Sequence, residues 1–215
     1  MASKATGGRR LDKVVTSGTF SIDGEDFAVD NNIWIPGDGE ECLVVDAAHE
    51  HQPITDAVAE RRVVAVICTH GHNDHINAAV ALADAVGAPI WMHPDDTMLW
   101  DQVHPTRAVD ASLQDGQVVE AGGWRFEVRH TPGHSPGGVV LHDTDAGVVF
   151  SGDTLFNGGP GATGRSFSSF ATIIESIRDR LLVLPADTVV RTGHGDDTTI
   201  GDEAPHLDEW IARGH

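Results

Sequence analysis

The chain has 215 residues, 40% of them hydrophobic, which is enough for the core of a single domain spanning residues 1–215. A formal net charge of −19, with 14 scattered basic residues, argues against a nucleic-acid partner, because phosphate binding needs a basic surface. No apolar run is long enough to span a membrane and none follows Arg9-Arg10 as in a signal peptide, so we expect no membrane partner and a cytoplasmic location.

The first half of the chain begins with strand patterns and then alternates strand and helix. Turns rich in glycine and acidic residues join three predicted strands: Val14–Ser21, Phe27–Ile35 and Glu41–Asp46. The next strand, Val63–Thr69, has β-branched residues and no polar alternation, which is typical of a strand buried on both faces. Apolar residues at helical spacing predict a helix from Asp74 to Val86, ended by Gly87 and Pro89.

The second half repeats the strand pattern. Three further strands are predicted, at Trp124–His130, Gly147–Phe150 and Asp187–Arg191. A helix is expected at Phe167–Leu184. Two packed sheets with helices outside would fit this order.

Between the strand Val63–Thr69 and the helix that follows lies the run His70-Gly71-His72-Asn73-Asp74-His75. Imidazole and carboxylate groups at such a loop can converge on divalent cations of the zinc type. His70 and His72 can reach one point while Asp74 and His75 point elsewhere, which indicates two adjacent ions. The alternative is a polar loop in which Asp74 merely caps a helix, and three histidines after a buried strand disfavour it.

Further candidate ligands follow the later strands. His134 lies in the turn Thr131-Pro132-Gly133-His134, Asp153 in Ser151-Gly152-Asp153 and His194 in Thr192-Gly193-His194-Gly195. A metal hydrolase needs such additional ligands while keeping a position open for water. The complete set is therefore expected to form a catalytic metal site.

In this order the residues resemble the metallo-β-lactamase-fold hydrolases, whose pattern is His-x-His-x-Asp-His, then His, Asp and His. The resemblance implies an α/β fold, the four-layer αββα sandwich. It also implies one ion held by three histidines, a second held by Asp74 and two histidines, and Asp153 bridging both ions. The implied ligands are His70, His72 and His134 for the first ion and Asp74, His75 and His194 for the second. Two divalent ions are the expected cofactors, zinc first, with iron or manganese as alternatives, and Asp74 and Asp153 are the expected catalytic residues.

The sequence around the ligands is similar to the glyoxalase II-like group, as in Thr69-His70-Gly71-His72 and Gly152-Asp153-Thr154-Leu155-Phe156. Two features depart from true glyoxalase II enzymes, which carry a helical extension for glutathione: about twenty residues follow His194, and the chain has no tyrosine. The name-giving β-lactamases lack the bridging carboxylate that stands here at Asp153, which argues against antibiotic hydrolysis.

The expected reaction is cleavage of a small hydroxyacyl thioester by a metal-bridging hydroxide, because a thiol can leave without a side-chain acid. A persulfide dioxygenase with a single iron on two histidines and one aspartate is the alternative, and a lactonase is a second, which the missing tyrosine disfavours. The acyl group, the thiol and the oligomeric state stay open. Twelve arginines against two lysines are typical of a GC-rich, actinobacterial genome, in which the thiol would be mycothiol.

Other residues carry weaker expectations. Asp46, after a buried strand, is expected either to orient a ligand histidine or to cap a turn. Arg165 is expected in a salt bridge rather than on a substrate carboxylate. Trp100 and His104, four residues apart, are expected to pack together rather than to roof a pocket.

The remaining cysteines and histidines are given no chemistry. Cys42 and Cys68 are expected to be core residues. Seven histidines are expected at the surface or in the core: His49, His51, His93, His130, His142, His206 and His215.

Overall fold

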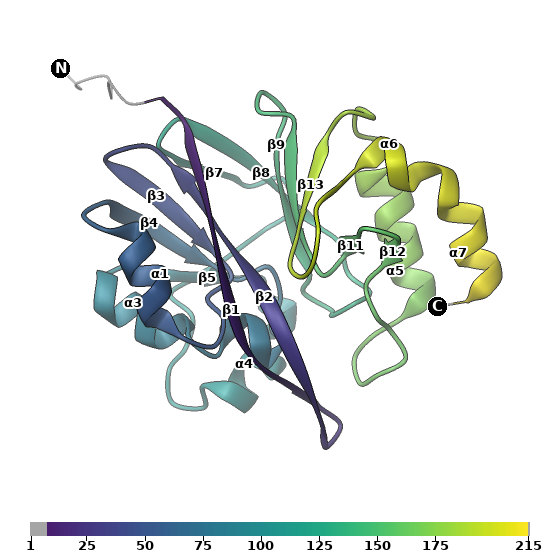
Figure 1. Ribbon diagram of the computed structural model, residues 1–215. Coiled ribbons are helices and arrows are strands. Elements are labelled where there is room, and N and C mark those ends of the chain that lie inside the picture. The colour runs from purple at the N-terminus through teal and green to yellow at the C-terminus, as the bar shows by residue number, and fades with distance from the viewer. Residues whose placement is uncertain (1–7, 215) are drawn as a thin grey trace.

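The computed structural model describes residues 8–214. Two six-stranded sheets lie face to face in the middle of the molecule, and helices cover the outer face of each (Figure 1). The predicted four-layer αββα sandwich is therefore confirmed.

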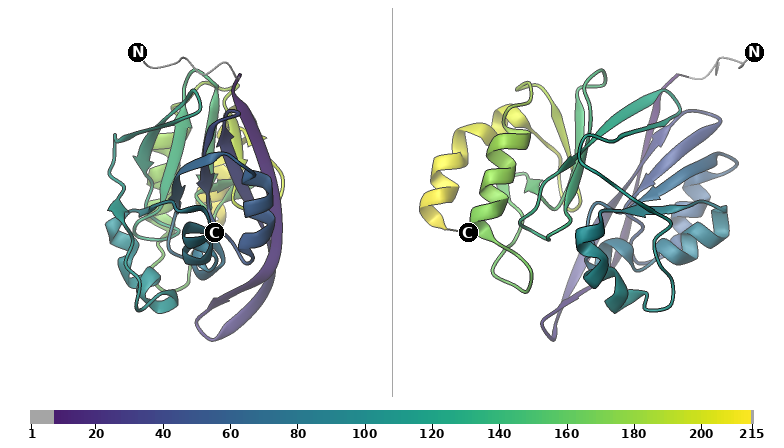
Figure 2. Two further views of the ribbon diagram at one scale, coloured as in Figure 1. Left: turned by 90° about the vertical axis from the view of Figure 1, so that its left-hand side faces the viewer. Right: turned by 180° about the vertical axis from the view of Figure 1, so that it is seen from behind.

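The first sheet has the strand order β1-β2-β3-β4-β5-β6. Its members are β1 (Arg10–Ile22), β2 (Glu25–Gly37), β3 (Glu41–Val45), β4 (Arg62–Ile67), β5 (Ile90–Met92) and β6 (Ala111–Ser112). β1 and β2 form a long antiparallel hairpin that extends beyond the body of the molecule, whereas β3 to β6 run parallel (Figure 2). The parallel strands all end at one edge of the sheet.

The second sheet has the order β14-β13-β10-β9-β8-β7. Its members are β7 (Val118–Ala121), β8 (Trp124–His130), β9 (Val139–Asp143), β10 (Val148–Gly152), β13 (Val189–Thr192) and β14 (Thr198–Thr199). A separate small hairpin pairs β11 (Leu155–Phe156) with β12 (Gly159–Pro160).

The helices fall into two groups, one on each side of the sandwich (Figure 1). Beside the first sheet lie α1 (His51–Val58), α2 (Asn73–Ile76), α3 (Ala79–Val86) and, after a 3-10 turn at Pro94–Asp96, α4 (Thr97–Val103). Beside the second lie α5 (Phe170–Ser176) with a π-helical turn at Ile177–Leu181, then α6 (Ile200–Glu203), a 3-10 turn at Ala204–His206 and α7 (Leu207–Arg213). Within the part of the chain described, no helix has both the length and the apolar character needed to cross a membrane.

The side chains of the central strands separate three layers of core. In β3, Cys42 and Val44 face the helices of the first sheet, whereas Leu43 and Val45 face the second sheet. In β10, Phe150 joins the core between the sheets and Val149 joins the core under α5 and α7. These strands are buried on both faces, as their uninterrupted apolar sequences predict.

Two predicted helices differ from the observed ones. The helix predicted from Asp74 to Val86 is two helices, α2 and α3, because the amide of Ala78 donates to Ala47 O, outside the helix. The helix predicted from Phe167 begins only at Phe170, because the Ser169 side chain accepts a hydrogen bond from Thr172 N and caps it. Its last turn, Ile177–Leu181, is π-helical.

Candidate metal centre

All seven predicted ligands lie together where strand ends of the two sheets meet. His70 and His72 follow β4, and Asp74 and His75 lie in α2. The second sheet supplies three more: His134 follows β8, Asp153 follows β10 and His194 follows β13. Their potential donor atoms form three groups in which all atoms lie within 4.8 Å of one another.

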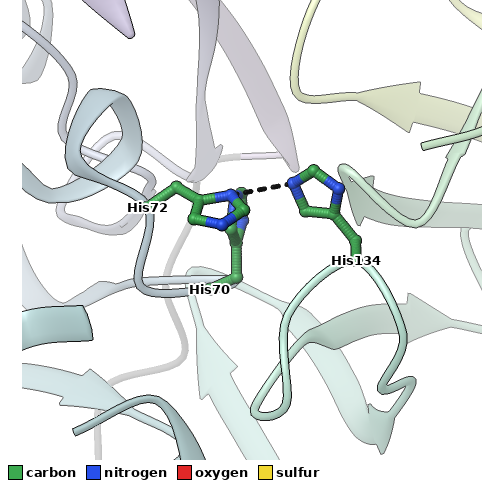
Figure 3. Close-up of side chains that lie close together, drawn as sticks. All are labelled: His70, His72 and His134. Carbon is green, nitrogen blue, oxygen red and sulfur yellow. Dashed lines mark hydrogen bonds between the residues drawn. The ribbon is translucent and has the colours of Figure 1, made fainter. Parts of the chain in front are cut away.

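The first group, called here the histidine cluster, consists of His70, His72 and His134. His72 Nδ1 lies 2.9 Å from His134 Nε2, and Figure 3 shows these two rings facing each other from opposite loops with His70 beside them. The three residues are between 2% and 9% exposed. Three imidazoles thus converge on one buried point.

Hydrogen bonds select which nitrogen of each ring faces that point. His134 Nδ1 donates to Ala162 O at 2.8 Å, which leaves its Nε2 for a cation. His70 Nδ1 lies 3.1 Å from Thr69 Oγ1, which likewise leaves Nε2. His72 turns Nδ1 towards the cluster, so its ligand atom differs from those of the other two histidines.

The second group, called here the mixed cluster, consists of Asp74, His75 and His194. His75 Nε2 lies 3.1 Å from His194 Nε2, and Asp74 Oδ2 lies 3.3 Å from the same His194 atom. The Nδ1 of His194 donates to Asp30 O, and the Nδ1 of His75 lies 2.9 Å from Asp46 Oδ2. Both histidines therefore present Nε2 to the cluster.

Asp153 lies between the two clusters. One of its carboxylate oxygens is 3.5 Å from His134 Nε2 in the histidine cluster and 3.3 Å from His194 Nε2 in the mixed cluster. The other oxygen is 3.3 Å from His75 Nε2. This is the position that a bridging carboxylate requires.

The protonation tendencies of the two clusters are opposite. Burial lowers the pKa of His72 to about 3 and that of His70 well below the ordinary value, so both are neutral. Burial also opposes a charge on His194, but Asp153 and Asp74 outweigh it and raise its pKa to about 10. His70 and His72 of the histidine cluster are thus neutral in the protein alone, whereas the mixed cluster is an ion-paired network.

The arrangement fits bound metal ions. Three buried donor atoms at the centre lack a hydrogen-bond partner among the described residues: His70 Nε2, Asp74 Oδ1 and Asp153 Oδ1. Unpaired buried polar atoms are costly and rare unless water or an ion satisfies them. Imidazole nitrogens and carboxylate oxygens suit zinc, iron and related divalent metals.

Asp46 orients the mixed cluster. Its two oxygens accept hydrogen bonds from Thr69 N and Thr69 Oγ1, and Oδ2 also contacts His75 Nδ1. Asp46 is 2% exposed. Of the two interpretations of its sequence position, the orientation of a ligand histidine is the one that the contacts support.

Asp96, which the sequence interpretation missed, ties together the two loops of the histidine cluster. It is fully buried and accepts hydrogen bonds from Gly71 N at 2.8 Å, Ser135 Oγ at 2.7 Å and Gly137 N at 2.5 Å. Gly71 lies between His70 and His72, and Ser135 follows His134. In the sequence, the segment His93-Pro94-Asp95-Asp96 resembles an ordinary surface turn. The role of Asp96 is therefore visible only from the packing of the folded chain.

A second missed group supports Asp74. Asn31 Nδ2 donates to Asp74 Oδ2 at 3.1 Å, and Asn31 Oδ1 lies 2.8 Å from His49 Nε2. Gly18 admits the His49 ring, since a Cβ at Gly18 would lie 2.1 Å from His49 Nδ1. His49, expected only as a surface or core histidine, is half-buried and is linked to Asp74 through Asn31.

The position before His194 has room only for a glycine, Gly193. A Cβ at Gly193 would lie 2.3 Å from Asp153 Oδ1 and 2.9 Å from His75 Cε1. Such distances are too short for any side chain, so the close approach of this loop to the ligands requires glycine.

The remaining candidates have structural roles. Arg165 pairs with Glu25, as expected. Trp100 and His104 pack against each other with ring centroids 4.5 Å apart. Both cysteines are buried free thiols, Cys42 and Cys68. The prediction for His215 lies outside the described residues.

The fold is a two-sheet αββα sandwich, and two clusters of histidine and aspartate side chains lie at its strand ends. Clusters of this kind are suited to metal ions, and together with the fold they define a class of metal-dependent proteins. The family model of the metallo-beta-lactamase superfamily matches residues 27–194, and the chain belongs to that superfamily.

Relatives within the superfamily support the predicted resemblance to the glyoxalase II-like group. The chain is 34% identical over 187 residues to the hydroxyacylglutathione hydrolase GloC of Haemophilus influenzae, covering 80% of this chain and 87% of that protein. TTHA1623, solved in a di-iron-bound form, is 31% identical with a TM-score of 0.73, covering 82% of this chain and 93% of that one. The BLEG-1 B3 metallo-beta-lactamase is 26% identical with a TM-score of 0.76, covering 89% and 98%.

Proposed function

We propose that the chain is a metal-dependent hydrolase that cleaves a small acyl thioester. The observation that carries the proposal is the use of every buried acid and base at the centre. The seven predicted ligands face one another, Asp46 is bound to His75 and Thr69, and Asp96 is bound to two loops. No buried carboxyl group or imidazole among these residues is left to protonate a leaving group.

That arrangement favours a thioester over an amide. The oxygen of water forms a bond to the acyl carbon, the carbon–sulfur bond breaks, and the products are a carboxylic acid and a thiol. A thiol with a pKa of about 8.5 leaves as the thiolate, whereas the amine of an amide needs a proton. When bound, the two ions supply an activated water and a Lewis acid for the carbonyl.

The residues proposed to hold the ions are those of the two clusters. His70, His72 and His134 would hold one ion, and Asp74, His75 and His194 the other. Asp153 lies between them and would bind both. Zinc is the first expectation from these ligands, and the di-iron form of TTHA1623 makes iron the alternative.

The name of GloC supports the reaction class, because a hydroxyacylglutathione hydrolase acts on a hydroxyacyl thioester. For this chain we expect S-lactoyl thioesters to be cleaved far faster than amides with the same acyl group. Thiol release is measured at neutral pH with protein loaded with zinc or with iron, and oxygen uptake on a persulfide is followed in parallel. Thioester cleavage that is lost with a chelator and restored by metal supports the proposal.

Three other results would overturn it. Oxygen uptake without thiol release would favour a mononuclear-iron persulfide dioxygenase. Faster hydrolysis of a cephalosporin than of any thioester would favour the activity that the name of BLEG-1 describes. Preferred cleavage of a lactone would favour a lactonase.

A further inference from the structure

A pocket of about 320 Å³ adjoins the histidine cluster. Four segments line it: the tip of the β1–β2 hairpin, the Gly71–Asn73 turn, α4, and the loop at Ser166 and Phe167. His72 stands at the inner end. A smaller pocket shares Ile22, His72 and Ser166 with it and reaches His134. A substrate whose scissile bond lies at the metal centre would extend into this space.

The structure holds the walls of the pocket in place. Asn73, next to His72, accepts from Ser21 N at 3.0 Å and donates to Thr19 O, which fixes the hairpin against the metal loop. On the opposite side, Ser166 Oγ donates to Asp23 at 2.7 Å. The hairpin tip is thus tied to both neighbouring segments.

The lining is apolar or uncharged apart from one carboxylate. Ile22, Leu99, Val103 and Phe167 supply apolar surface, and Phe167 is 55% exposed. Phe167 has a φ of +67°, which is an uncommon and costly conformation for an aromatic residue and is found most often at functional sites.

The electrostatics of the pocket disfavour anions. Among the described residues that line it, none is a lysine or an arginine, and Asp23 is its acidic member. Hydrogen bonds from Ser166 lower the pKa of Asp23, so this carboxylate is charged at neutral pH. In the adjoining pocket, Arg165 pairs with Glu25 at 2.5 Å and lies over the Phe27 ring. Glu25 and the nearby Asp23 offset the charge of this guanidinium.

We propose, resting on the proposed thioester hydrolysis, that this pocket binds the thiol carrier of the substrate and that the carrier is an uncharged, amphiphilic group. Apolar contacts from Leu99, Val103 and Phe167 hold the carrier, and Gln102 and Ser166 offer polar partners. Carriers that bear carboxylates or phosphates are rejected, because Asp23 and the strongly negative chain repel them.

The test uses two uncleavable ligands that differ only in charge. S-hexyl-N-acetylglutathione carries two carboxylates, and its diamide carries none. Their binding to the full-length protein is measured by titration calorimetry, with and without zinc. The diamide is expected to bind at least about tenfold more tightly, with the gap narrowing as salt increases. Equal affinities, tighter binding of the dianion, or no binding of either ligand would overturn the proposal.

A matched pair of variants places the effect in the pocket. Gln102→Lys adds one positive charge to the lining, and Asp101→Asn makes the same change of net charge at the neighbouring exposed position on α4, outside the lining. Gln102→Lys is expected to reduce the ratio of the diamide affinity to the dianion affinity by at least about fivefold. Asp101→Asn is expected to leave this ratio unchanged. Equal effects of the two variants would contradict the pocket assignment.

The two hypotheses can fail separately. The corresponding S-hexanoyl thioesters are assayed for thiol release with the zinc-loaded protein. If neither is cleaved although the diamide ligand binds, the proposed hydrolysis fails and the pocket assignment stands. If the dianionic thioester is cleaved faster, the hydrolysis stands and the pocket assignment is wrong.

Discussion

The two halves of the metal centre are built differently. The histidine cluster consists of three imidazoles, and the loops that carry them are tied together by one buried carboxylate, Asp96. The mixed cluster includes a carboxylate, Asp74, and a partly exposed histidine, His194, whose side chain is 24% exposed. Its outer partners are the Asp46 side chain for His75 and the backbone oxygen of Asp30 for His194.

This difference suggests that the two metal positions respond to separate substitutions. The histidine cluster depends on the packing of two loops, and the mixed cluster depends on a network that reaches the first sheet through Asn31 and His49. Asp153 lies within 3.5 Å of ring nitrogens in both clusters. Substitutions should therefore fall into three classes: those that affect both positions, those that affect one position, and those that only weaken one.

The largest effect is expected for Asp153→Ala. Removal of the carboxylate between the clusters leaves two cations to repel each other without a bridge, so metal binding and activity should be lost together. Activity should fall by more than about a hundredfold, the upper range for residues that only support a ligand. Metal binding is measured by elemental analysis, and activity is measured as thioester turnover. Two retained ions with near-normal turnover would remove Asp153 from this role.

Substitution of one ligand in each cluster should separate the two positions. Asp74→Ala is expected to release the ion of the mixed cluster and His72→Ala the ion of the histidine cluster, because each side chain belongs to one cluster. Metal titration of the two variants should give one strong site each. If Asp74→Ala retains two equivalents, the assignment of the mixed cluster is wrong.

A smaller effect is expected when the supporting carboxylates are neutralised. Asp96→Asn should weaken binding in the histidine cluster by about 10- to 100-fold. Asp46→Asn should weaken binding in the mixed cluster by the same factor and in the histidine cluster by less, because Asp46 contacts His75 directly but reaches His70 only through Thr69. Competition with a chelator of known affinity measures both constants, and thermal unfolding checks that each variant is folded. An equal loss at both positions in both variants would show that the clusters are not supported independently.

The smallest effect is expected for Asn31→Ala. Asp74 would lose one hydrogen bond, worth about 1 kcal/mol. This loss corresponds to roughly fivefold weaker binding of the ion in the mixed cluster. The histidine cluster, which Asn31 does not contact, serves as the internal control in the same titration. A larger loss in the histidine cluster than in the mixed cluster would contradict the proposed network.

The sequence predicts the members of the two clusters better than the residues that support them. His70, His134 and Asp153 each follow a recognisable strand and stand beside a glycine, so their position in the fold can be inferred locally. Asp96 and Asn31 act through contacts with residues at least 18 positions away in the chain. No local periodicity encodes such contacts, and they become visible only when the sheets are packed.

The layers of the fold were predictable for the same reason. Uninterrupted apolar strands such as Val63–Thr69 indicate burial on both faces, and β4 has that burial. The break between α2 and α3 was not predictable, because apolar spacing continues across it. The break depends on the hydrogen bond from Ala78 N to Ala47 O, which is a tertiary contact.

The most direct test of the account is the anomalous scattering of crystals of the zinc-loaded protein, recorded at the zinc absorption edge. The account predicts two peaks about 3.5–4 Å apart, the separation usual in two-metal sites, with Asp153 contacting both. One peak would be ligated by His70, His72 and His134, and the other by Asp74, His75 and His194. A single peak, or two peaks that share no ligand, would contradict it.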